Sequence, residues 1–254
     1  MGFRSSFEKV RPSRSTSTGS DHCSAPGRLR IGFTDRSPHG SPVHDDCRAA
    51  VRDAAVLFEE LGHEVEEASP PHDAHAVVET VSTLLAVHLA HGIDELSAAT
   101  GIAATADTVE HCNLALAERA RQLSAPDFLG TLETVTAVAR RAASFWTTYD
   151  VWLTPTLGLP PVEHGYITPL LDDVDTYLER WFTFAPFTPL ANVTGNPAMN
   201  LPTYWSTDGL PVGVNLTGRF GAETTLFRLA AQIEAARPWS AHRPPVSAWH
   251  HVAA

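Results

Sequence analysis

The sequence predicts an α/β fold, chiefly from the order of its first three elements. An alternating apolar segment at 28–34 is followed by a helical stripe at 45–61 and a second alternating segment at 63–68. A strand, a helix and a strand in this order are typical of a parallel βαβ unit. A hairpin pattern near the C-terminal end adds further strands to the predicted sheet.

Each element of the βαβ unit has a local signal. Apolar residues alternate within 28–34, as they do in a half-buried strand. Asp45 is placed to cap the following helix, and Gly62 to end it, because glycine readily adopts the left-handed conformation found past a helix end. The helix carries one apolar stripe, formed by Cys47, Val51, Ala54, Ala55, Phe58 and Leu61.

The middle of the chain, residues 70–150, is predicted to be mostly helical. Apolar residues have helical spacing in 73–93, 106–123 and 125–149, and Gly101 and Pro126 mark the breaks.

A buried strand is predicted next, at 149–157, followed by a short helix around 170–182. Pro155 has no N–H to donate, so we expect pairing of this strand to stop there.

The last segment predicts a hairpin and a final helix. Two strand-like segments, 198–205 and 210–218, flank the turn-forming pair Asp208 and Gly209. Pro238 ends the helix that follows, and its apolar face consists of Leu226, Leu229, Ala230 and Ile233.

Composition excludes some classes of function. The formal net charge is −11 with no clustered Lys and Arg, so we expect no nucleic-acid partner. No apolar run is judged long enough to span a membrane, and no secretory signal is recognised, so no membrane partner is expected. Three widely spaced cysteines, Cys23, Cys47 and Cys112, favour a reducing compartment, and we expect a cytoplasmic protein.

The chain is expected to form one domain with tails. Residues 1–27 are rich in Ser, Thr, Arg and Pro and are predicted to be a flexible tail or linker. The domain is predicted to cover 28–245, and 246–254 to form a second tail.

No motif in the chain supplies an obvious catalytic group. His88 and His91 are three apart, whereas a hydrolytic zinc helix needs two histidines four apart with a glutamate, so we expect no metal. No G-x-S-x-G segment marks a nucleophilic serine. Cys112 follows His111 directly, and because neighbouring residues on a helix point in different directions, these two do not form a catalytic Cys–His pair.

Polar residues are instead crowded next to apolar segments, which indicates pocket-lining loops. The residues predicted to line or support a substrate pocket are Thr154, Thr156, Asn192, Thr194 and Gly195.

These segments resemble the C-terminal half of the amidase signature family. The resemblance runs over 28–245 and is carried by "YDVWLTPTLGLPP", "FTPLANVTGNPAMNLP" and "GLPVGVNLTG" in matching order and approximate spacing. Within the family, the sequence is most similar to bacterial amidases that act on nylon-type cyclic oligomers. The resemblance implies a mixed central β-sheet flanked by helices.

The resemblance also implies amide hydrolysis as the family's reaction, and it implies that the catalytic N-terminal half is missing from this chain. Family members hydrolyse amides with a serine nucleophile, a second serine in a cis peptide bond and a lysine base, without metal or organic cofactor. A lysine acts as a base only when neutral, which requires burial. That triad belongs to the N-terminal half. The one lysine here, Lys9, and the serines of the tail, such as Ser15 and Ser17, do not fit its setting, so no residue is assigned a catalytic role.

Two hypotheses follow for the function. The first is a truncated C-terminal amidase portion, inactive alone, which would take a small amide substrate if an N-terminal half complemented it. The second is a non-enzymatic binding module derived from an amidase. The sequence indicates neither the substrate nor the oligomeric state.

Overall fold

The computed structural model describes residues 25–244 and confirms the α/β class. Five strands form one sheet in the order β2-β1-β3-β5-β4. β1 pairs in parallel with β2 and β3, whereas β3 with β5 and β5 with β4 pair antiparallel, so the sheet is mixed. The strands are β1 (Arg30–Phe33), β2 (Glu64–Glu67), β3 (Val151–Pro155), β4 (Ala198–Trp205) and β5 (Pro211–Gly218).

The predicted βαβ unit is confirmed, with one correction at the helix start. α1 (Asp45–Glu60) joins β1 to β2, and Gly62 has a φ of 93° just past its end. The N-cap is His44, not Asp45, because the backbone of His44 is extended and its ring accepts a hydrogen bond from the N–H of Asp46. Asp45 and Asp46 lie in the first turn, where negative charge also stabilises a helix.

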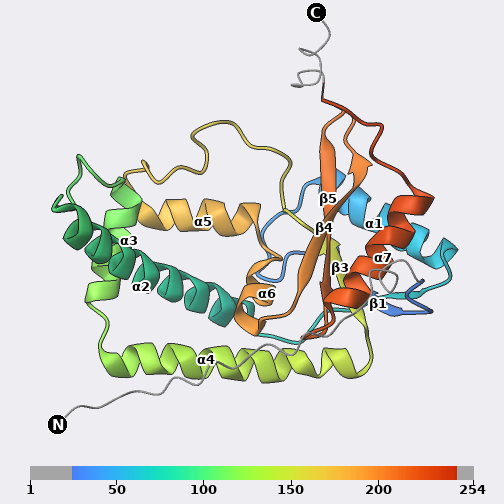
Figure 1. Cartoon of the computed structure of the whole chain (residues 1–254), viewed down its shortest axis with the longest axis horizontal. Helices are drawn as coiled ribbons and strands as arrows, with labels where there is room; N and C mark the ends of the chain where they lie inside the picture. Colours follow the sequence, from blue (N-terminus) through green and yellow to red (C-terminus); the bar gives the residue numbers. More distant parts are fainter. Residues whose placement is uncertain (1–24, 245–254) are drawn as a thin grey trace, which may run out of the picture.

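One face of the sheet is covered by α1 and the final helix, α7 (Glu223–Ala236), as Figure 1 shows. Strand residues alternate, so every second residue points to this face. The buried cluster there contains Ile31, Val151, Leu153, Val214 and Leu216 from the strands, together with residues of both helices.

The other helices form a lobe beside the sheet (Figure 1). Trp152 of β3 joins this lobe to the sheet by packing with Val77, Phe145 and Leu190. The predicted helical middle of the chain is therefore confirmed. The lobe consists of α2 (Ala74–Thr100), α3 (His111–Arg121), α4 (Ala125–Ala143), a short 3₁₀ helix (Phe145–Thr147), α5 (Val174–Phe184) and α6 (Pro189–Thr194).

The expectation that no apolar run reaches membrane-spanning length is wrong for α2. Among residues 25–244, this helix alone is long and apolar enough to cross a membrane by length and composition; its best window has a mean hydropathy of 1.4. The core helix of a soluble protein passes the same test, so one such helix is weak evidence for a membrane span. Only 22% of that window is buried, and many of the other residues of α2 are partly buried rather than exposed.

β3 ends at Pro155, as expected, and the last pair of its ladder with β5 is Pro155–Val214. One further hydrogen bond follows, from the N–H of Thr156 to the carbonyl of Gly213 at 3.1 Å. The structure corrects one further expectation. The segment expected to be a loop around Asn192 is mostly the short helix α6, and Gly195, with a φ of 71°, caps its C-terminal end.

Candidate functional site

A row of polar side chains crosses the sheet on the face opposite α1 and α7. Thr154 of β3 stands directly opposite Asn215 of β5, and Asn215 stands opposite Asn200 of β4. We call these three residues the polar row. Val151 and Leu153 point to the α1 face, so alternation places Thr154 on the other side.

The members of the row differ in how their polar groups are satisfied. The side-chain amide of Asn215 donates to the hydroxyl of Thr217 at 3.1 Å. The hydroxyl of Thr156 donates to the side-chain oxygen of Asn200. The Thr154 hydroxyl is buried and has no hydrogen-bond partner in the described part of the chain. Thr154 is therefore an unsatisfied donor, and leaving a buried hydroxyl without a partner costs about 1–3 kcal/mol.

A small cavity opens at the Asn200 end of the row. It has a volume of 210 Å³ and is lined by Thr156, Asn200 and Gly213, among others. A Cβ at Gly213 would overlap the side chain of Asn200, so any larger residue there would displace this side chain from its present position. Cys47 also lines the cavity, but burial, with a smaller effect of Asp46, raises the pKa of its thiol to about 11. The thiol therefore stays protonated at neutral pH and is a poor nucleophile.

The structure brings together only two of the five predicted pocket residues. Thr154 lies in the polar row, and Thr156 contacts the row through Asn200. Asn192, Thr194 and Gly195 lie instead in and after α6, before the start of β4. Their role in a substrate pocket, like that of the threonines, stays a prediction.

The α6 residues have local structural partners. The Thr194 hydroxyl donates to the carbonyl of Leu190 in its own helix, at 2.8 Å. Asn192 is exposed. Asn196 donates from its side chain to the carbonyl of Gly218 at 2.7 Å, which fixes the entry of the chain into the β4–β5 hairpin.

Sequence reasoning missed Asn200 and Asn215 as site residues. Both stand in segments that the sequence predicts as strands. A signal was present: in β5, Val212, Val214 and Leu216 alternate with a glycine and polar residues, so the second face of this strand is not apolar. Knowing which face the row occupies required the pairing of three strands.

Outside the polar row, the partly buried His39 has no hydrogen bond or ion pair to an acidic side chain within residues 25–244. Its ring nitrogen Nε2 lies 3.1 Å from the carbonyl oxygen of Phe182, and burial lowers its pKa. Within 25–244, no group of three or more His, Cys, Asp or Glu side chains could hold a metal ion. Lys9, Ser15 and Ser17 lie outside the described residues.

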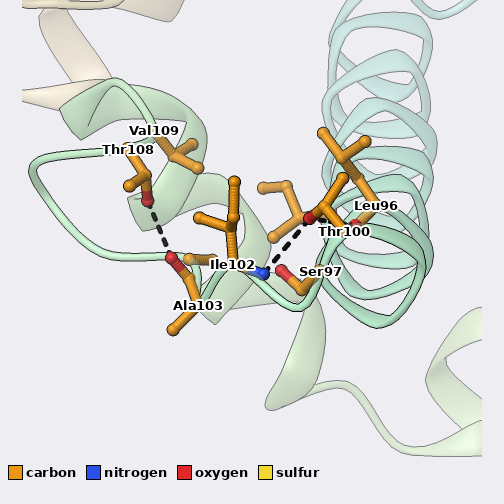
Figure 2. A pocket seen from close by; sticks show the side chains of 9 residues that line it. Leu96, Ser97, Thr100, Ile102, Ala103, Thr108 and Val109 are labelled. Carbon is orange, nitrogen blue, oxygen red and sulfur yellow. Dashed lines mark hydrogen bonds between the residues drawn. The ribbon is translucent and has the colours of Figure 1, made fainter.

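A second hollow, far from the polar row, lies between the end of α2 and the following loop (Figure 2). It measures 340 Å³ and has an apolar wall that includes Leu96, Ile102 and Val109. Its hydroxyls hold the loop: Thr108 donates to the carbonyl of Ala103 at 2.9 Å, and Thr100 accepts from the N–H of Ile102 at 3.2 Å. None of its lining residues is titratable, so this hollow supplies no acid or base.

The fold and the comparisons with known proteins point to the same protein family. The sequence pattern of the amidase family matches residues 4–227, and the chain belongs to this family. The match includes part of the predicted N-terminal tail, which lies outside the described residues.

Among curated proteins, 6-aminohexanoate-cyclic-dimer hydrolase of Paenarthrobacter ureafaciens is 31% identical over 227 residues, covering 86% of this chain and 46% of the relative. The hydrolase of the same description from Pseudomonas sp. (strain NK87) is also 31% identical, with the same coverage. A solved structure of 6-aminohexanoate cyclic dimer hydrolase superposes with a TM-score of 0.83 at 29% identity, over 96% of this chain and 52% of that chain. The chain thus spans about half the length of the curated relatives it matches.

Proposed function

We propose that this chain is the C-terminal portion of an amide hydrolase and that it has no hydrolytic activity alone. The observation that carries the proposal is its extent: 96% of this chain superposes on 52% of a cyclic amide hydrolase. In this proposal the polar row and its cavity form one wall of a substrate site, and the nucleophile and base come from the portion not spanned here.

The chemistry of the described residues supports this division. Amide hydrolysis needs an activated nucleophile beside a base. The candidate thiol in the cavity, Cys47, is held protonated, and its nearest titratable influence is the carboxylate Asp46, which raises its pKa further. Asn and Thr side chains can hydrogen-bond an amide group of a substrate, but they do not cleave it.

A direct test uses the whole chain with a serine-directed fluorophosphonate probe and with simple aryl amides. We expect neither covalent labelling nor amine release above the rate without protein. Both this chain and the P. ureafaciens hydrolase are also assayed on 6-aminohexanoate cyclic dimer, for which the P. ureafaciens hydrolase is the positive control. Labelling together with turnover by this chain alone would overturn the proposal.

Translation of the DNA upstream of the coding region in all frames distinguishes this proposal from the alternative, a non-enzymatic module. A Gly-Ser-rich segment with a lysine upstream of it supports an amidase portion. Its absence favours the module.

A further inference from the structure

The cavity at one end of the polar row is held open by backbone hydrogen bonds. Its volume is 210 Å³, and one of its walls is the loop that follows β3. Gly158 fixes this loop: its carbonyl accepts from the N–H of His44, and its N–H donates to the carbonyl of Phe184, both at 2.8 Å. Thr156 joins the loop to β5, since its N–H donates to the carbonyl of Gly213 at 3.1 Å. A ligand therefore meets a formed site and does not have to order the loop on binding.

The lining of this cavity is uncharged. Among the residues that line it, the only titratable group is the thiol of Cys47, which stays protonated at neutral pH. The carboxylate of Asp46 lies close enough to this thiol to raise its pKa. A buried charge without a partner of opposite sign is costly, so the lining favours a neutral ligand. The apolar part of the lining consists of Leu157, Leu159, Pro160, Pro161, Pro211 and Val212.

A hydrogen-bond donor and an acceptor lie next to each other on the lining. The hydroxyl of Thr156 donates to Oδ1 of Asn200, so these two side chains are in contact. The hydroxyl oxygen of Thr156 can still accept a hydrogen bond, because it has two lone pairs. The Nδ2 of Asn200 has two N–H groups to donate and no hydrogen-bond partner among residues 25–244. Together the two side chains can donate to one group of a ligand and accept from its neighbour.

An amide matches this pair only when its C=O and N–H lie on the same edge. An open-chain secondary amide is trans, so its C=O and N–H point in opposite directions. The amide of a small lactam ring is cis, and a primary amide has one N–H beside its C=O. The size of the cavity suits a small ring: a cavity of about 150 Å³ holds benzene, and this one measures 210 Å³.

On the basis of the proposed function, we infer that this cavity is a subsite for a small neutral amide with C=O and N–H on one edge, a lactam or a primary amide. The C=O of the ligand accepts from Nδ2 of Asn200, and its N–H donates to the hydroxyl oxygen of Thr156. Both residues are therefore specificity-determining. Hydrolysis gives a carboxylate and an ammonium ion, which the uncharged lining disfavours, so the products leave this subsite readily.

Binding to the whole chain can be measured without any hydrolysis. The ¹⁵N-labelled chain is titrated with ε-caprolactam, a seven-membered lactam, and NMR follows the side-chain amide of Asn200 and the backbone amide of Gly213. We expect saturable shifts of both signals, with a dissociation constant in the millimolar range for a ligand of this size. The ring-opened form, 6-aminohexanoate, should cause no shift at the same concentrations, because it is charged.

Two further ligands of similar size separate the hydrogen bonds. ε-Caprolactone has the same ring but no N–H, and N-methylpentanamide is an open-chain trans amide. Each can form only one of the two bonds, so we expect both to bind ~5-fold more weakly than ε-caprolactam. Equal affinities of all three would show an unselective apolar cavity and refute the subsite.

Thr156→Val tests the acceptor with little change in shape. We expect this variant to bind ε-caprolactam no more tightly than ε-caprolactone, while its affinity for the lactone matches that of the native chain and verifies that the cavity is intact. Thr131→Val is the matched control, because the hydroxyl of Thr131 donates to the carbonyl of Asp127 within α4. There the preference of ~5-fold for the lactam should remain.

Asn200→Leu tests the donor. The lactam and the lactone both have a C=O, so we expect both to bind ~5-fold more weakly, as followed at Gly213. Asn113→Leu, in α3, is the matched control and should leave both affinities unchanged.

The outcome for the subsite is independent of the outcome for the proposed function. An absence of saturable shifts at Asn200 and Gly213, or an unchanged preference for the lactam in Thr156→Val, refutes the subsite and leaves the proposed function intact. Selective binding together with amide turnover by this chain alone supports the subsite while the proposed function fails.

Discussion

At the residue scale, Thr154 is the least expected feature of the sheet. Its side chain is buried at the β3 end of the polar row with an unpaired hydroxyl, whereas the neighbouring Asn215 has Thr217 as a partner. The sequence predicts a buried strand here, but it could not show that one of its hydroxyls lacks a partner. Hydrogen-bond satisfaction depends on neighbouring strands, which lie about 60 residues away in the chain.

Thr154→Val is expected to stabilise the isolated chain by about 1 kcal/mol, because valine has nearly the same shape and removes a hydroxyl whose burial costs about 1–3 kcal/mol. For a chain of this size, the midpoint of thermal unfolding should rise by ~2–4 °C. Thr217→Val is the contrast: it removes the acceptor of the Asn215 amide and should destabilise by about 1 kcal/mol or more. A loss of stability in Thr154→Val would mean that the hydroxyl has a partner.

At the element scale, helix ends were the least accurate part of the sequence prediction. α1 begins where expected, but a histidine rather than Asp45 caps it, and α6 replaces a predicted loop. α6 has only six residues, too few for a periodic apolar pattern. Its Pro189 at the start and Gly195 past the end were local signals that agree with a helix.

Gly195→Ala tests the end of α6. The left-handed conformation at φ 71° disfavours any residue with a Cβ, so we expect a loss of about 1 kcal/mol in the free energy of unfolding. Gly130→Ala is the matched control. Gly130 lies inside α4 with open space around it, so alanine should stabilise there by ~0.5–1 kcal/mol. Urea unfolding of both variants checks the opposite signs; equal effects would contradict the assignment of α6.

At the scale of the whole molecule, His63 joins three elements that are distant in sequence. Its Nδ1 accepts a hydrogen bond from the N–H of Leu29, at 3.2 Å, so the ring is neutral and Nε2 donates to the side chain of Gln232 in α7, at 3.0 Å. Burial lowers its pKa, and the bond to Gln232 offsets part of this effect.

The lowered pKa predicts a loss of stability in acid. The unfolded chain binds a proton at His63 near its ordinary pKa of 6.5, whereas the folded chain resists protonation. The stabilising contribution is therefore complete above pH 6.5 and declines as the pH falls below it. Urea unfolding at pH 7.5 and 5.5 should show a larger loss in the native sequence than in His63→Gln, which has no titratable ring. Equal losses would place the acid sensitivity elsewhere.

The sequence by itself determined the α/β class, the βαβ unit, the hairpin and the family, because these follow from short-range periodicity, turn chemistry and motif order. Only the tertiary structure showed that Thr154, Asn215 and Asn200 form one row. The physical reason is strand register: with a side-chain period of two, the pairing of distant strands decides which groups meet.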